Sequence, residues 1–389
     1  MMVEISQLKV NEIGAGTKRF SALVGGREVW IEAPGALAPA PRGEMFLAIG
    51  LFLAMARRED LVVDPALPLC PELTARLPHI IAIIRQWNPE LGAPRIEARQ
   101  EPVAAQPGLV FTSFSGGVDS TYTFHRHRDS ITHLLVTNCF DEAGATEPFE
   151  ALVKKVAAFA DEHAKAVLPI ATNARRVCEA QGMSWDYLHG PFLCLTAAAF
   201  GPAQYFIPSS FSVRQLKPWG SHPLLDPMWS TATTRIVHDG IEVPRTQKIR
   251  ALSRDPALLR YLQVCWYSKI NNCGTCTKCT RTLLVLRELG VTDAPFPDVD
   301  PTARIDAMRP DSDIAAAYIW DLWRFFEDRG RADIAARLRK RLDRYLLKRN
   351  MNNLVKTVIG RRGKAVFHGL RKTGWRDKSV LIRDPDNFE

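Results

Sequence analysis

Six consecutive residues carry the clearest chemical signal in the chain, Ser115-Gly116-Gly117-Val118-Asp119-Ser120. They follow an apolar run at 109–114, which indicates a buried strand, and precede residues 121–124, which can open a helix. Glycines let a backbone approach a ligand, and the N–H groups of such a turn and of a helix N-terminus attract anions. The alternative is an ordinary Gly-Gly turn with an Asp or Ser cap. The position between strand and helix favours a phosphate-binding loop.

The side chains of this loop suit a chain of phosphates. The hydroxyls of Ser115 and Ser120 can contact phosphate oxygens. A carboxylate at Asp119 would repel phosphate unless Mg²⁺ lies between them, or unless it only caps the helix. We predict that Asp119, Ser115 and Ser120 are catalytic. The sequence G-x-x-x-x-G-K-[ST] of γ-phosphate-cleaving loops is absent from the chain.

Four clustered cysteines form the second signal, Cys265-x7-Cys273-x2-Cys276-x2-Cys279. Thiolates at this spacing suit a closed tetrahedral zinc site, and Gly274 lets the chain turn sharply between ligands. The alternative is an iron–sulfur cluster, which thiolates also hold. Four protein ligands leave no open position for catalysis, so we expect a structural metal that holds residues 262–290 in place.

Together the two motifs resemble a known family. The string S-G-G-x-D-S resembles the PP-loop of the ATP pyrophosphatases, and its combination with C-x7-C-G-x-C-x2-C resembles the 7-cyano-7-deazaguanine synthases, the QueC family. The resemblance covers about residues 108–290. It implies ATP, Mg²⁺ and Zn²⁺, adenylation of a carboxylate with release of pyrophosphate, and attack of ammonia to give an amide and then a nitrile. By position, it implies nucleotide contacts from residues 115–120 and metal ligation by the four clustered cysteines.

Strand and helix signals alternate from residue 108 to about residue 255. This alternation predicts an α/β fold, in which a parallel Rossmann-like sheet has helices on both faces. Ligands of such sheets bind at the carboxyl ends of the strands. Polar residues at the expected strand ends are therefore candidates for the site: Asn138, Asp141, Thr172, Asn173, Ser209 and Ser210.

Residues 209–240 form a long irregular segment, which we interpret as a substrate loop. The helix that follows begins with residues 245–250, and its Lys248 is a candidate phosphate ligand, with a solvated basic face as the alternative. Within the loop, the candidate substrate contacts are Lys217, His222, Asp226 and His238. The candidate nucleotide-binding residues are Ser113, Phe114, Ser115, Gly116, Gly117, Val118, Asp119, Ser120, Asn138 and Lys248.

The remaining segments flank this core. Residues before about 106 predict a small α+β domain with a hairpin around Gly25-Gly26 and helices at 44–57 and 71–87. Two apolar stripes at 311–349 predict a helical hairpin around Gly330. The predicted domains are 1–106, then 107–295 with a zinc knuckle at 262–290, then 296–389 with the hairpin and a basic tail.

The charge of the 389-residue chain is uneven. The net charge is +9, but residues 331–378 hold 16 Lys/Arg against 3 Asp/Glu, so the other residues sum to −4. This basic run predicts a partner such as a nucleic acid, an anionic lipid surface or a protein, with a solvated tail as the alternative. No signal-peptide pattern is visible, and the longest apolar run, 45–56, is too short to span a bilayer. We expect a cytoplasmic homo-oligomer.

The leading hypothesis is a QueC-like ligase that adenylates a small-molecule carboxylate and joins it to an amine donor, releasing AMP and pyrophosphate. One alternative is a PP-loop sulfurtransferase acting on RNA or a small molecule, for which Cys139 at a strand end is the candidate reactive thiol. Another is a QueC-like protein-modifying or nucleotide-binding component of a larger assembly, suggested by the N-terminal domain and the basic tail.

Overall fold

The structure, a computed structural model, describes residues 2–14, 16–139, 146–265, 267–268 and 271–368, with side chains for all of these except 146–147 and 352–368. The chain divides into two compact units. Within the described residues, the first unit comprises the chain up to residue 242 together with 261–263. The second comprises 243–260 and the chain from 264 onward.

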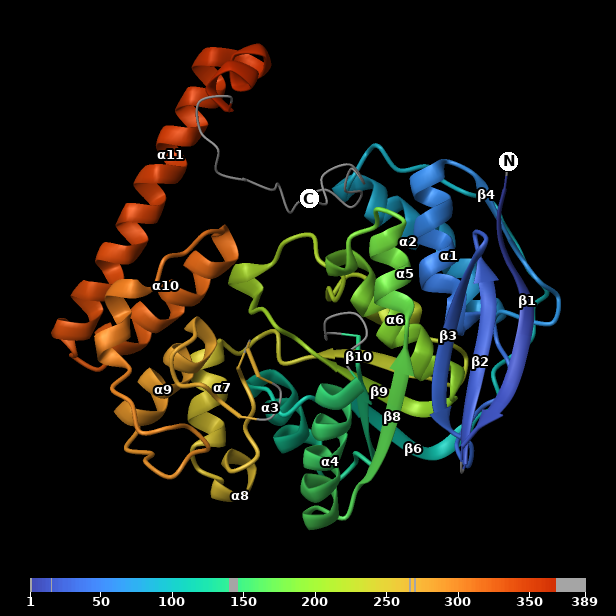
Figure 1. Cartoon of the computed structure of the whole chain (residues 1–389), viewed down its shortest axis with the longest axis horizontal. Helices are drawn as coiled ribbons and strands as arrows, with labels where there is room; N and C mark the ends of the chain where they lie inside the picture. Colours follow the sequence, from blue (N-terminus) through green and yellow to red (C-terminus); the bar gives the residue numbers. More distant parts are fainter. Residues whose placement is uncertain (1, 15, 140–145, 266, 269–270, 369–389) are drawn as a thin grey trace. The chain divides into compact units, whose positions relative to one another are not determined.

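A mixed ten-stranded sheet organises the first unit (Figure 1). Its strands are β1 (Met2–Ile13), β2 (Thr17–Val24), β3 (Arg27–Pro34), β4 (Asp60–Val63), β5 (Ile96–Glu97), β6 (Gln106–Ser113), β7 (His133–Thr137), β8 (Ala166–Thr172), β9 (Pro202–Pro208) and β10 (Arg235–Asp239). The strand order is β10-β9-β6-β7-β8-β3-β2-β1-β4-β5, and most neighbouring pairs are parallel. The predicted α/β class is confirmed, and so is the N-terminal hairpin of β2 and β3.

Helices cover both faces of this sheet. His238 and Asp239 are neighbours on β10, so their side chains point to opposite faces. Asp239 accepts a hydrogen bond from Thr123 of one helix, whereas His238 contacts Asp226 of a 3₁₀ turn on the other face. The helical elements of the unit are α1 (Glu44–Arg57), α2 (Pro71–Trp87), α3 (Val118–His127), α4 (Thr146–Glu162), α5 (Ala174–Ala180), α6 (Trp185–Ala199), η1 (Val213–Gln215) and η2 (Asp226–Trp229).

The five parallel strands β8-β7-β6-β9-β10 place β6 at the centre. After β6 the chain builds β7 and β8 on one side of it, and later builds β9 and β10 on the other side. The strand order therefore reverses at β6, and the carboxyl end of such a strand is where open α/β sheets bind ligands. The loop after β6 begins at this point.

The parallel strands join the N-terminal strands at β3 and β8, whose antiparallel pairing spans only two residues on each strand. Side chains reinforce this short pairing. Thr172 donates its hydroxyl to the carbonyl of Trp30 at 2.7 Å. Asn173 accepts from the Trp30 N–H at 2.9 Å and donates to the carbonyl of Glu28 at 2.9 Å. Thr172 and Asn173, two of the candidate site residues at the strand ends, thus hold the sheet together.

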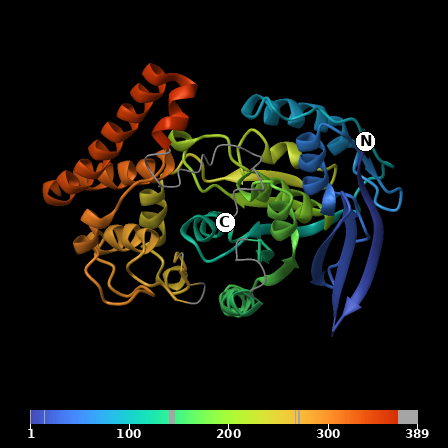
Figure 2. The same ribbon diagram turned by 45° about the horizontal axis from the view of Figure 1, so that its top comes forward.

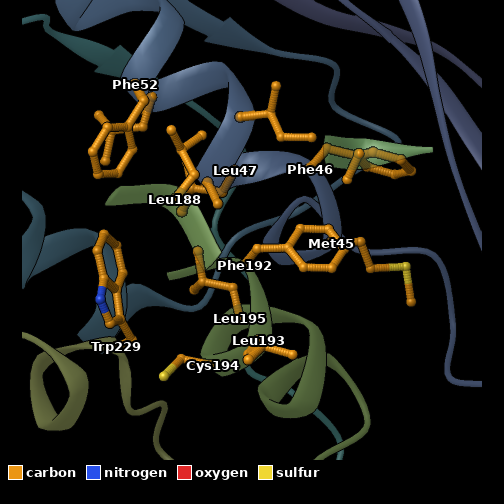
Figure 3. Packing of buried hydrophobic residues seen from close by; sticks show 14 of the residues in the cluster. Met45, Phe46, Leu47, Phe52, Leu188, Phe192, Leu193, Cys194, Leu195 and Trp229 are labelled. Carbon is orange, nitrogen blue, oxygen red and sulfur yellow. The ribbon is translucent and has the colours of Figure 1, made fainter. Parts of the chain in front are cut away.

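Helix α1 is the most apolar helix of the unit, with every residue from Glu44 to Met55 buried. A helix that is apolar all round belongs in a core. It packs against α6, and Figure 3 shows the two helices interdigitating around Trp229 of η2. The side chains labelled there are all buried: Met45, Phe46, Leu47, Phe52, Leu188, Phe192, Leu193, Cys194, Leu195 and Trp229.

Helices dominate the second unit. They are α7 (Arg245–Leu252), α8 (Pro256–Leu259), α9 (Thr277–Glu288), η3 (Thr302–Ala307), α10 (Asp313–Glu327) and α11 (Ala332–His368). The predicted hairpin around Gly330 is confirmed, but α11 runs on through residues expected to form a tail (Figure 2). No proline interrupts 332–368, and lysine, arginine and leucine favour helix. None of the described helices has both the length and the apolar composition needed to cross a membrane.

We predict that Asn173→Ala lowers the free energy of unfolding by about 1–3 kcal/mol, because two backbone groups at the β3–β8 junction lose their partner. Urea unfolding followed by circular dichroism measures this. The matched control is Asn11→Ala on an exposed position of β1, which should stay within about 0.5 kcal/mol of the wild type. Equal stability of the two variants would contradict the role of Asn173.

Candidate phosphate site, proton relay and metal centre

The loop after β6 has a backbone that only glycine can form. Gly116 has a φ of +71°, a region that side chains disfavour. Its carbonyl accepts a hydrogen bond from the Gln263 N–H at 2.7 Å. A Cβ at this position would lie 3.1 Å from the carbonyl oxygen of Tyr261. Gly117 then returns to extended backbone and caps α3, so the loop and the N-terminal turn of the helix present their N–H groups together.

The two serines of the loop hold it by weak internal hydrogen bonds. Ser120 Oγ donates to the Gly117 carbonyl at 3.1 Å and accepts from the Ser115 N–H at 3.3 Å. Ser115 Oγ accepts from the Gly117 N–H at 3.4 Å. Bonds this long are easily exchanged for bonds to phosphate oxygens. Asp119 is half-buried in the first turn of α3, where the helix dipole favours a carboxylate.

Three other predicted nucleotide-binding residues lie beside this loop in packing roles. The Ser113 hydroxyl is 2.5 Å from the Tyr205 hydroxyl. Phe114 is buried, with its ring stacked on Phe159 at 4.6 Å. Asn138 bonds both backbone groups of Thr172, at 3.0 and 3.1 Å, and so links the ends of β7 and β8. Val118 is buried behind the loop.

Two residues absent from the sequence-based set support the loop from behind. Gln263 holds the Gly116 carbonyl through its N–H, and its side-chain oxygen accepts from Lys155 Nζ at 3.0 Å. Burial lowers the pKa of Lys155, because it disfavours the charged form of the amine. This leaves a partly desolvated cation close to the phosphate loop. No motif spacing links positions 155, 263 and 116, so the sequence held no signal for this arrangement.

The predicted substrate loop holds a chain of three polar side chains. Asp226, which is fully buried, lies 2.7 Å from Nδ1 of His238, and Nε2 of the same ring lies 2.8 Å from Ser209 Oγ. A carboxylate, an imidazole and a hydroxyl at these distances can move a proton along one line. We call this set the relay. It joins three residues that the sequence only named singly.

The relay lies at the same sheet edge as the phosphate loop. Thr112 of β6 pairs with Phe206 of β9, and Ser115 and Ser209 each follow three residues later. The two serines therefore emerge at the carboxyl ends of neighbouring strands. Ser209 Oγ also donates to the carbonyl of Phe211 at 2.7 Å, which holds the start of the substrate loop over it.

Other groups of the substrate loop surround Asp226. Ser221 Oγ donates to this carboxylate at 2.7 Å, and the His222 N–H donates at 3.2 Å. Burial lowers the pKa of His222, whose ring contacts Trp87 edge-on. Lys217 instead lies over the ring of Trp219, 4.7 Å from its centroid. The relay is thus part of a larger hydrogen-bond network around Asp226.

The alternative reactive thiol is inaccessible. Cys139 is only 1% exposed, and its sulfur lies 2.9 Å from the Thr137 hydroxyl. Reactive cysteines are usually partly exposed, whereas Cys139 is buried. The candidate Asp141 lies outside the described residues.

The second unit holds the four clustered cysteines. Their sulfur atoms all lie within 4.8 Å of one another, and Cys273 and Cys279 are 3.9 Å apart. A tetrahedral zinc–thiolate site with bonds of about 2.3 Å places its sulfurs about 3.8 Å apart. The four thiols can therefore hold a metal ion such as zinc. Lys248 belongs to the same unit, on α7, with 2% of its surface exposed.

The backbone shapes this cluster before any metal binds. Gly274 has a φ of +73°, and a Cβ there would lie 2.8 Å from Pro297 and 2.9 Å from Val299. Asn272 Oδ1 accepts a hydrogen bond from the Val264 N–H at 2.8 Å. This bond links the residue before Cys265 to the residue before Cys273. Burial works against ionisation of Cys273, but hydrogen bonds from Thr275 and the Cys276 N–H outweigh it and lower its pKa to about 6. A thiol with this pKa is readily deprotonated for metal binding.

Comparison with known proteins identifies no relative of this chain: no family model, no curated protein and no solved structure matches it. The function must therefore be argued from the phosphate loop, the relay and the cysteine cluster themselves.

We predict that removing metal from the cysteine cluster lowers the melting temperature by more than about 10 °C, because metal binding supplies folding free energy of several kcal/mol. Differential scanning calorimetry with and without a strong chelator measures this, and elemental analysis identifies the metal. The control is Cys276→Ser, which should melt low and respond little to the chelator. An unchanged melting temperature of the metal-free wild type would refute a structural metal.

Proposed function

We propose that the protein is an AMP-forming, ATP-dependent ligase that activates a carboxylate as an acyl-adenylate and transfers the acyl group to an amine. The observation that carries the proposal is the left-handed Gly116, which turns the chain from the end of the central strand into α3. A glycine turn that leads into a helix N-terminus suits anion binding, and this one lies where the strand order reverses. The resemblance of residues 115–120 to the PP-loop then favours cleavage between the α and β phosphates.

Each residue of the loop has a distinct part in this proposal. The N–H groups of the glycine turn hold the phosphate chain and stabilise the charge of the departing pyrophosphate. The Ser115 and Ser120 hydroxyls exchange their weak internal bonds for bonds to phosphate oxygens. The Asp119 carboxylate would hold a Mg²⁺ ion, which would neutralise charge at the phosphates. Lys155 adds a nearby positive charge behind the loop.

The relay supplies the base that the second half of the reaction needs. When the amine attacks the acyl carbon, a C–N bond forms and the bond between the acyl carbon and the phosphate oxygen of AMP breaks. AMP leaves, and the nitrogen must lose a proton. We assign that proton to Ser209, whose own hydroxyl proton passes to His238 Nε2 once its bond to the Phe211 carbonyl has opened. The buried Asp226 carboxylate then stabilises the imidazolium. Opening of the Ser209–Phe211 bond would expose the hydroxyl to substrate.

The other features fit an enzyme of this class. We assign zinc to the four thiolates, as a structural ion that orders the second unit. We place the protein in the cytosol, where ATP is plentiful and such thiols stay reduced. The sulfurtransferase alternative is less well supported, since Cys139 is buried. A nucleotide-binding module remains an alternative that differs in one respect: it would release no pyrophosphate.

We predict that the purified protein, given ATP, Mg²⁺, ammonium and a panel of carboxylates that includes 7-carboxy-7-deazaguanine, forms AMP and pyrophosphate. Asp119→Asn should lower this rate at least about a hundredfold, since it removes the charge that holds Mg²⁺. Mass spectrometry of the nucleotide products, with a pyrophosphate assay, measures both. Asp129→Asn, an exposed residue just after α3, is the matched control and should keep full activity. ADP as the product, or a fully active Asp119→Asn, would overturn the proposal.

We further predict that His238→Gln slows acyl transfer to ammonium at least about tenfold but leaves ATP–pyrophosphate exchange within about twofold, because only the transfer step needs the base. Hydroxylamine, which is far less protonated than ammonium near neutral pH, should restore part of the rate. Ser209→Ala should behave in the same way. Equal losses in exchange and transfer would indicate that the relay only supports the fold.

A further inference from the structure

The solvent side of α11 carries three cations that make no ion pair with the described residues. Lys340, Arg344 and Lys348 are all exposed, and within the described part of the chain none of them has an ion-pair partner. The other arginines between residues 331 and 349 are different, because each is paired with a carboxylate. The pairs are Arg331–Glu288, Arg337–Asp306, Arg339–Asp343, Arg341–Asp306 and Arg349–Asp313.

The three cations form a row. Residues four apart in a helix share one face, and successive members of the row are separated by a rise of about 6 Å. Leu347 and Met351 lie on the same face, with 64% and 59% of their surfaces exposed. Asp313 at the start of α10 bonds Tyr345 and Arg349, so this part of α11 lies alongside α10 in the hairpin (Figure 1). The five exposed residues point away from α10, whereas Leu338 and Leu342 are buried. We call these five residues the α11 face.

The mixture of basic and apolar residues on the α11 face indicates which kind of partner it suits. Helices that lie on a membrane separate a basic face from an apolar one. On α11, Leu347 and Met351 lie among the cations instead, since 344, 347, 348 and 351 follow one another at three- and four-residue spacing. A nucleic acid strand presents regularly spaced phosphates with apolar sugar surfaces between them, and this matches such a mixed face.

We propose that the α11 face binds the sugar–phosphate backbone of a nucleic acid. Charge complementarity supports this occupant, because residues 331–378 hold 16 Lys/Arg against 3 Asp/Glu. The binding is electrostatic and independent of base sequence, since lysine and arginine on phosphates carry no sequence information. The proposal stands apart from the ligase activity, because every residue of the face belongs to α11 and none to the phosphate loop.

The test is fluorescence anisotropy of the full chain with labelled single-stranded DNA, duplex DNA and RNA of one sequence, over salt from about 50 to 200 mM. The wild type should bind with an affinity that falls steeply with salt. The variant Lys340→Ala/Arg344→Ala/Lys348→Ala should lose about tenfold or more in affinity at low salt, and the slope on duplex DNA should shrink by about 2–3. Comparison of the three probes shows which nucleic acid is preferred.

The matched control is Arg250→Ala/Arg254→Ala/Arg309→Ala, which removes the same charge from exposed positions elsewhere in the second unit. It should bind with nearly the wild-type slope. Binding that ignores salt, equal effects of the two triple variants, or tighter binding to phosphatidylserine vesicles than to any nucleic acid would each overturn the proposal. Melting temperatures check the fold, and if the triple variant melts early, the single charge reversal Lys348→Glu repeats the test.

Discussion

The first unit depends on a constraint of parallel pairing: strand β6 is bonded on both sides, so its carboxyl end opens at the centre of the five parallel strands. A parallel strand cannot return by a tight hairpin, and the chain must leave this end by a turn and a helix. The bond from Gln263 to the Gly116 carbonyl fixes that turn in the left-handed region. The positions of the phosphate loop, of the neighbouring Ser209 and of the start of α3 all depend on how the chain leaves β6.

Local signals in the sequence were sufficient for much of the fold and part of the site. The bounds of α1 and α2 agree with the apolar patterns, and the cysteine cluster follows from spacing alone, because all four ligands lie within fifteen residues. The strand–glycine–helix transition at 113–118 is likewise local. In each of these the residues that interact are close together in the chain, so their pattern is visible without tertiary structure.

The sequence failed where distant residues meet. Nothing in it pairs Lys155 with Gln263, or Asp226 with His238 and Ser209, because only the folded sheet brings them together. Strands β1, β4 and β10 were also missed. β10 is short and largely polar, and β4 has only four residues. In β1 the alternation is interrupted by a register shift between Ser6 and Lys9. Thr172 and Asn173 were interpreted as candidate residues of the ligand site. They instead make hydrogen bonds to the backbone of β3, which the sequence could not place beside β8.

The bonds from Ser209 to His238 and from His238 to Asp226 close the substrate segment at its base. The outer stretch of the segment, residues 213–219, contains no strand and is mostly exposed. Its contacts with the rest of the unit include the bond from the Val213 N–H to the carbonyl of Ile241 and the ring of Trp219 against His189 of α6. Descendants of this protein could therefore exchange or lengthen that outer stretch and acquire new substrates while the strands beneath stay unchanged. The segment gives the fold a place where specificity can evolve separately from stability.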